Sequence, residues 1–324
     1  MMVDKGIEYK IEGNSRRAVI NQYATTRRIG FRDLSVGATK YDVSQLAKKD
    51  VDKLIADGLG SFKSQFTIGI EIEKSEFSQR DIREYALFAG LERDGSCGVE
   101  GVTNIIPLLP PCIWRNKVYN MMYEAKNLIE DSSSPSDYRC GGHMTIGAIG
   151  LNGADIHRAI RKNMGIVYAL FRKRLSNYYC SQNLFMDLDF YSHNQKYQPF
   201  NVKNSVIEIR LIARFQSVKQ LMRRYELMYE IMNFSINNPN GSHSTLMKKV
   251  RPIIKSMYGG DEAKADEIIS LANSFRRMLV TRKINRDVYP FVIEVKDWRG
   301  SNTNRFDDIS QHLDRDLLRN PVID

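Results

Sequence analysis

No stretch of the sequence reaches about 18 consecutive apolar residues, the length that a membrane-spanning helix requires. The first 17 residues are polar and charged and lack the apolar segment of a secretory signal. Cysteine is scarce too, with four residues at irregular spacing in a chain of 324. These absences predict a cytoplasmic protein that has no membrane partner and keeps its thiols reduced. The cysteines are Cys97, Cys112, Cys140 and Cys180.

Several sequence motifs of common enzyme classes are also missing. The chain has no GxxxxGK[ST] loop, no GxGxxG between a strand and a helix, and no GxSxG elbow. P-loop, Rossmann and α/β-hydrolase folds are therefore excluded. Cys140 and His143 have a spacing found in zinc sites, but no second pair of ligands follows closely, which disfavours zinc.

Positive charge is in excess. Hydrophobic residues make up 42% and charged residues 27%, which is typical of a globular protein, and the formal net charge is +10. Residues 151–230 contain 13 lysines and arginines against 6 acidic residues. This excess indicates a polyanionic partner, either nucleic acid or a nucleoside triphosphate, while a solvated basic helix face is the simpler alternative.

Strand-like and helix-like segments alternate at unequal spacing. This pattern predicts an α+β protein whose sheet is antiparallel or mixed and covered by helices. We expect an N-terminal extension over 1–62, a core over 63–240 and a mostly helical region over 241–324. The expected strands are 66–73, 98–109, 140–149, 205–213 and 288–295. The expected helices are 43–59, 79–89, 114–130, 155–175 and 217–234, with a loop over 131–137.

Four of the expected strands each place ionisable side chains on one face, because side chains two residues apart on a strand point the same way. A solvent-facing edge, a core histidine or a structural salt bridge would explain each strand taken alone. Together they offer a carboxylate-rich group that suits Mg²⁺ or Mn²⁺. The residues are Glu71 and Glu73, Glu100, His143 and Thr145, and Glu208 and Arg210.

The order of these motifs resembles the amidoligase family, carboxylate–amine ligases of the glutamine synthetase and glutamate–cysteine ligase superfamily. The resemblance covers about residues 66–234. It rests on the segments Gly69-Ile-Glu-Ile-Glu73, Asp94-Gly-Ser96 followed by Glu100, Cys140-Gly-Gly-His143 and Ile207-Glu-Ile-Arg210.

The resemblance implies a glutamine synthetase-like sheet that forms an active-site cleft, with ATP as co-substrate and Mg²⁺ or Mn²⁺ as cofactor. The metal ligands would be Glu71, Glu73, Glu100, His143 and Glu208. The residues that bind ATP would be His143, Arg210 and Arg214, and the catalytic residues would be Glu100 and Arg210. The substrates would be a carboxylate, from a small molecule, a peptide or a protein, and an amine.

Two alternatives remain open from the sequence. The first is a non-catalytic, basic protein on a ligase-like fold that binds nucleic acid or serves in assembly, through residues 151–230 with their interleaved tyrosines. The second is a metal-dependent nuclease or phosphotransferase that uses the same carboxylates. The glutamates favour the ligase, because a nucleic-acid groove would repel them.

Overall fold

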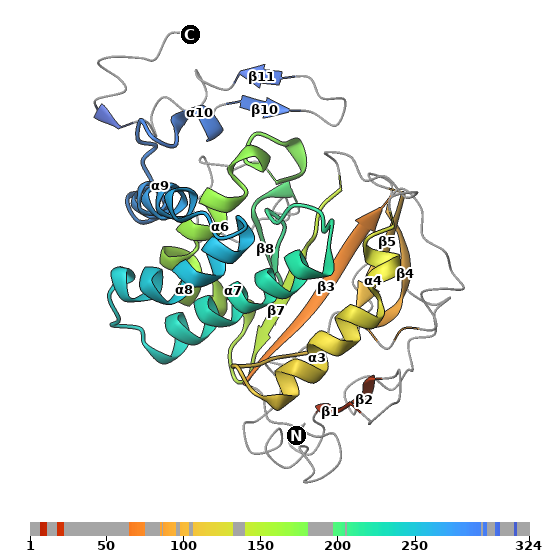
Figure 1. Cartoon of the computed structure of the whole chain (residues 1–324). Helices are drawn as coiled ribbons and strands as arrows, with labels where there is room; N and C mark the ends of the chain where they lie inside the picture. The colour runs from red at the N-terminus through yellow and green to blue at the C-terminus, as the bar shows by residue number, and fades with distance from the viewer. Residues whose placement is uncertain are drawn as a thin grey trace. The chain divides into compact units, whose positions relative to one another are not determined.

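The computed structural model of the chain, drawn in Figure 1, consists of two compact units. The first unit comprises Met1–Ile156, Val202–Ile209 and Ala213–Tyr229, and the second comprises His157–Asn201, Arg210–Ile212 and Glu230–Asp324. The described residues are 7–11, 18–22, 65–74, 85, 87–94, 98–103, 106–131, 140–180, 197–204, 206–292, 294–296, 302–304 and 314–315.

An open antiparallel sheet organises the first unit, so the predicted α+β class and antiparallel sheet are confirmed. Its strands follow the order β4-β5-β3-β7-β9-β8, and β6 pairs with the first half of β3. A separate hairpin of β1 (Ile7–Ile11) and β2 (Ala18–Gln22) precedes it in the chain. The sheet strands are β3 (Phe66–Lys74), β4 (Phe88–Asp94), β5 (Gly98–Thr103), β6 (Ile106–Leu108), β7 (Met144–Ala148), β8 (Phe200–Val202) and β9 (Ile207–Ile209).

The central strand β3 has two chemically different faces. Ile68, Ile70 and Ile72 alternate with Glu71 and Glu73, and all five side chains are buried. Burying three isoleucines contributes about 1.5–3 kcal/mol each, which fixes the register, because a slip of one residue would exchange the two faces.

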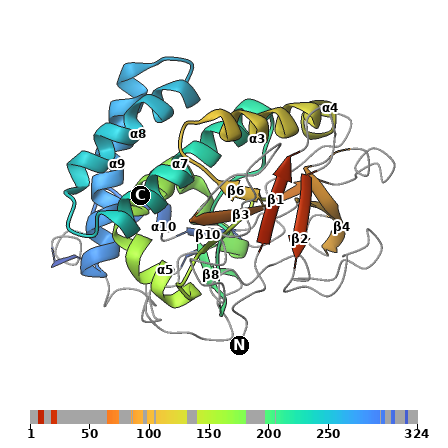
Figure 2. The same cartoon turned by 90° about the horizontal axis from the view of Figure 1, so that it is seen from below.

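Helices cover the isoleucine face of the sheet. Lys74 extends from that face and donates hydrogen bonds of 2.9 Å to the carbonyls of Leu128 and Asp131, at the end of α4 (Lys126–Ile129). Burial lowers the pKa of Lys74, an effect that Asp131 partly opposes. Figure 2 shows α4 and the preceding α3 (Ile113–Glu124) on one side of β3 and β6.

A buried ion-pair network joins α3 to the first part of α7 (Val218–Asn237). The carboxylate of Glu226 lies 2.7 Å from Arg115 and 2.6 Å from Arg223, and accepts a 2.8 Å hydrogen bond from the Tyr119 hydroxyl. Burial alone would raise the pKa of Glu226, but these hydrogen bonds and positive charges hold it below its usual value. The network therefore locks the two helices together.

The described part of the second unit is mainly helical. Its α6 (Gly165–Leu170) packs against α9 (Glu262–Thr281) at a very close approach. A Cβ on Gly165 would lie 2.4 Å from the carbonyl oxygen of Ala272, so only glycine fits there. The unit also contains α8 (His243–Met257), α10 (Tyr289–Val292), and the paired strands β10 (Glu294–Lys296) and β11 (Asn302–Asn304).

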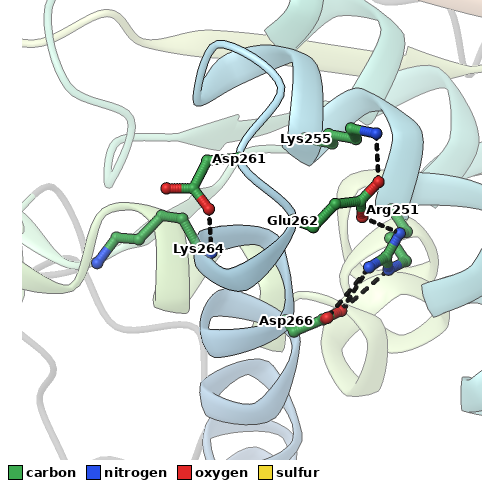
Figure 3. A network of polar contacts seen from close by, with 6 residues as sticks. All are labelled: Arg251, Lys255, Asp261, Glu262, Lys264 and Asp266. Carbon is green, nitrogen blue, oxygen red and sulfur yellow. Dashed lines mark hydrogen bonds and ion pairs between the residues drawn. The ribbon is translucent and has the colours of Figure 1, made fainter.

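The junction of α8 and α9 carries a surface ion-pair network (Figure 3). Arg251 of α8 lies 2.5 Å from Glu262 and 2.9 Å from Asp266 of α9. Asp261 caps α9 by accepting a 2.9 Å hydrogen bond from the Lys264 amide. Because the paired side chains are exposed, each ion pair contributes little to stability. The hydrogen bond by which Asp261 caps α9 contributes more than any one of these ion pairs.

Three predictions of secondary structure were wrong in part. The expected helix 79–89 ends in strand, because β4 begins at Phe88. The single helix expected to start at Asp155 is a series of short helices: α5 (Gly153–Ile160), η2 (Arg161–Asn163), α6 and η3 (Arg172–Arg174). Its N-terminal cap is Asn152, whose side-chain oxygen accepts a hydrogen bond from the Asp155 amide. Half of the expected strand 288–295 is the helix α10 (Tyr289–Val292), whereas Glu294 and Val295 do lie in a strand, β10.

Other predictions can be checked only in the described part of the chain. Cys112, Cys140 and Cys180 form no disulfide bond, whereas Cys97 lies outside the described residues. The expected helix 43–59 lies outside them as well, and so does most of the expected loop 131–137. Among the residues that are described, no helix is both long and apolar enough to cross a membrane.

Candidate metal site

Three neighbouring strands bring the predicted glutamates and histidine together. The amide of Glu71 donates a 2.9 Å hydrogen bond to the carbonyl of His143, so β3 and the residue before β7 lie side by side. Thr145 stands directly opposite Glu208 of β9 in the register. Residues opposite one another share a face of the sheet, so Glu71, Glu73, His143, Thr145 and Glu208 form one surface, here called the carboxylate face.

Three carboxylates converge on one ring nitrogen. The Nδ1 atom of His143 lies 3.0 Å from Glu71 Oε2, 3.1 Å from Glu73 Oε1 and 3.8 Å from Glu208 Oε1. The ligand atoms of Glu71, His143 and Glu208 all lie within 4.8 Å of one another. Glu208 is only 1% exposed and Glu73 only 3%. Buried carboxylates this close repel one another and are normally neutralised by a proton, a basic side chain or a metal ion.

Two groups hold these carboxylates in place. The Gly141 amide donates a 2.5 Å hydrogen bond to Glu73 Oε2. The Lys203 ammonium lies 2.5 Å from Glu208 Oε2 and remains 28% exposed. Lys203 was not predicted from the sequence. It lies in the turn between β8 and β9, which the hydrogen bond from its amide to the Val206 carbonyl closes, and a basic residue in a turn is too common to be a signal.

The other predicted site residues lie outside the group formed by His143 and its three glutamates. Glu100 of β5 stands opposite Glu73 in the register and is buried. Glu92 of β4, which the sequence did not single out, stands opposite Glu100 in turn. Arg210 is buried and belongs to the second unit. Arg214 is half-buried, and its carbonyl accepts a hydrogen bond from the Arg224 guanidinium. The roles of Glu100, Arg210 and Arg214 stay predictions.

The donor set fits an oxygen-preferring divalent cation. Glu71 and Glu208 offer carboxylate oxygens, His143 offers one nitrogen, and Glu73 adds a further carboxylate beside them. Mg²⁺ and Mn²⁺ prefer such ligands, whereas structural zinc sites are built mainly from cysteine and histidine. Cys140 is not part of this group of three. Searches of the sequence against family models and curated proteins find no match.

Proposed function

We propose that the protein is an ATP-dependent carboxylate–amine ligase on a glutamine synthetase-like sheet. The observation that carries this proposal is the convergence of Glu71, Glu73 and Glu208 on His143, on the face of the sheet opposite the covering helices. Glu71, Glu208 and His143 would hold Mg²⁺ or Mn²⁺, which supplies positive charge for the phosphate oxygens of ATP. The same motifs carry the resemblance to the amidoligase family.

The chemistry explains why such residues are needed. An oxygen of the substrate carboxylate attacks the γ-phosphorus of ATP, the bond to ADP breaks, and an acyl phosphate forms. The amine then attacks the acyl carbon, phosphate leaves, and the amine loses a proton. Glu100 is the residue that we assign to this proton transfer, and Arg210 is the residue that we assign to the charge on the phosphoryl group. Burial of the glutamate side chains on the carboxylate face limits the access of water, which would hydrolyse the acyl phosphate.

The basic segment 151–230 supports nucleic-acid binding less well. Three of its arginines, Arg174, Arg210 and Arg224, are buried, and Arg223 pairs with Glu226. Arg224 donates hydrogen bonds to two backbone carbonyls and lies over the Phe215 ring. A phosphate-binding groove needs exposed cations along one surface, whereas these side chains serve the interior. At least these four of the thirteen basic side chains in the segment therefore have structural contacts inside the protein.

Enzyme assays test the proposal directly. Full-length protein is incubated with Mg²⁺, ATP and a panel of carboxylates and amines, phosphate release is followed, and the amide product is identified by mass spectrometry. We expect phosphate release that requires both substrates, and a loss of at least a hundredfold in Glu71→Gln and Glu73→Gln.

The matched control is Glu226→Gln. Glu226 is also a buried glutamate of the first unit, but it pairs with arginines on helices rather than with His143. Its replacement should lower the melting temperature and leave turnover per folded molecule unchanged. Phosphate release that persists at the parental rate in Glu71→Gln would contradict the proposal, and so would an amide-forming activity without any divalent cation.

A further inference from the structure

An open space lies on the carboxylate face beside the metal group. Gly69 belongs to that face, because it precedes Glu71 by two residues on β3. A Cβ atom built on Gly69 would meet no heavy atom of the described residues within 4 Å. Gly69 is also only half-buried, whereas the other eight residues of β3 are buried. The strand therefore leaves room for a small group next to Glu71, and this room reaches solvent.

A buried hydroxyl group borders this space. Thr145 stands directly opposite Gly69 in the β3–β7 register and opposite Glu208 in the β7–β9 register. It is 8% exposed, and its Oγ1 atom has no hydrogen-bond partner within the described chain. Most buried polar groups are hydrogen-bonded, so an isolated hydroxyl at this position indicates a group that arrives from outside the protein.

On the side of Thr145 away from Gly69, Glu208 of β9 is paired with the cation Lys203. Glu208 separates Thr145 on β7 from Lys203, whose ammonium lies 2.5 Å from Glu208 Oε2. The side chain of Lys203 is 28% exposed, so it reaches both the buried carboxylate and solvent. The Thr145 hydroxyl can donate a hydrogen bond to an anion, Lys203 offsets the negative charge of Glu208, and a metal ion held by Glu71, His143 and Glu208 would attract an anionic ligand.

We propose that the space over Gly69 binds a substrate oxyanion, with the Thr145 hydroxyl donating a hydrogen bond to it and Lys203 offsetting the negative charge of the neighbouring Glu208. The inference rests on the proposed function and extends it, since it names the group that lies beside the metal ion: the carboxylate of the acid substrate or the phosphoryl group that it receives. Both are oxyanions, and the experiment below distinguishes them.

The test uses the full chain loaded with Mn²⁺, and acetate and inorganic phosphate as probes. Bound Mn²⁺ relaxes the ¹³C nucleus of acetate or the ³¹P nucleus of phosphate when the anion binds within several ångströms of the ion. We expect saturable relaxation of at least one probe. A response to acetate assigns the space to the substrate carboxylate, and a response to phosphate assigns it to the phosphoryl group.

Two variants locate the response. Gly69→Ala fills the space, and because its Cβ meets no neighbour it should fold as well as the parent. Thr145→Val keeps the shape and removes the hydroxyl, while Thr145→Ser restores it. We expect anion affinity to fall at least tenfold in Gly69→Ala and at least fivefold in Thr145→Val, to recover in Thr145→Ser, and Mn²⁺ affinity to stay within twofold throughout.

The outcomes separate this inference from the function on which it rests. If the parent protein fails to bind Mn²⁺, the proposed function is overturned, and this inference with it. If Mn²⁺ binds but neither probe is relaxed, or if Gly69→Ala and Thr145→Val bind the probe as tightly as the parent, the oxyanion site is overturned and the metal site stands.

Discussion

Replacing Glu208 by glutamine should abolish metal binding without unfolding the protein. Glu208→Gln keeps the volume of the side chain and removes one charge from a group that holds two further carboxylates and a histidine. In the protein without metal, the charge of Glu208 has opposing effects. Lys203, at 2.5 Å, attracts it, while Glu71, whose ligand atom lies within 4.8 Å, repels it.

The size of each effect follows from Coulomb's law. Two unit charges 4 Å apart interact by about 4 kcal/mol at an effective dielectric constant of about 20. At these distances the attraction exceeds the repulsion by about 3 kcal/mol, and solvent around the partly exposed Lys203 weakens the attraction, so the free energy of unfolding without metal should change by less than about 3 kcal/mol. When a metal ion is bound, its positive charge offsets the repulsion between the carboxylates, so removing the charge of Glu208 only weakens metal binding. We therefore expect Mn²⁺ affinity to fall at least a hundredfold, which corresponds to about 2.7 kcal/mol.

Thermal unfolding with and without Mn²⁺ measures both quantities on one preparation. A ligand at 100 times its Kd stabilises the native state by about 2.7 kcal/mol, which raises the melting temperature of a unit of this size by about 5–10 °C. The parent should show this rise and Glu208→Gln should not, each compared with the same protein without metal. An equal rise in both proteins would refute the assignment of Glu208 as a ligand.

Three further predictions concern the second unit. Gly165→Ala places a Cβ 2.4 Å from the Ala272 carbonyl oxygen, so it should lower the free energy of unfolding, measured by urea denaturation, by at least about 2 kcal/mol. An unchanged midpoint of urea unfolding would show that α6 and α9 do not approach so closely. Asp261→Ala removes the cap of α9 and should lower the free energy of unfolding by about 1 kcal/mol by the same assay, whereas a wild-type value would exclude the cap. Burial and, secondarily, the charge of Arg276 lower the pKa of His243 to about 4. The unfolded chain therefore binds more protons between pH 6.5 and 4, so stability falls as the pH drops through this range. His243→Gln should reduce that loss, and identical pH slopes in both proteins would refute the effect.

The carboxylate face could be predicted from the sequence because successive side chains of a strand point to opposite faces of the sheet, so every second residue shares a face. Glu71 and Glu73 between isoleucines leave only one way for the strand to bury its apolar side. The alternation at Glu208 is equally clear. The pairing of these strands was predicted only through the order of the motifs, since no local pattern specifies which strand lies beside which.

The secondary-structure predictions that were wrong failed because contacts between residues distant in the sequence override local preferences. Strand β4 contains alanine, leucine, glutamate and arginine, which favour helices, and its pairing with β5 overrides that preference. The expected helix after Asp155 is interrupted near Gly165, where α9 approaches, and this approach depends on residues a hundred positions away. Lys203 and the open space over Gly69 became visible only once the strands were placed side by side.

An open sheet must also avoid joining the sheets of other molecules. The two ends of the strand order are β4 and β8. Strand β8 has three residues, too few to offer a long row of free backbone groups. Strand β4 is longer, but its pairing with β5 shifts between Phe88 and Gly90, a bulge that bends the outer edge. Short and bent edge strands resist edge-to-edge aggregation, so the sheet that carries the carboxylate face also protects its two edges from pairing with another molecule.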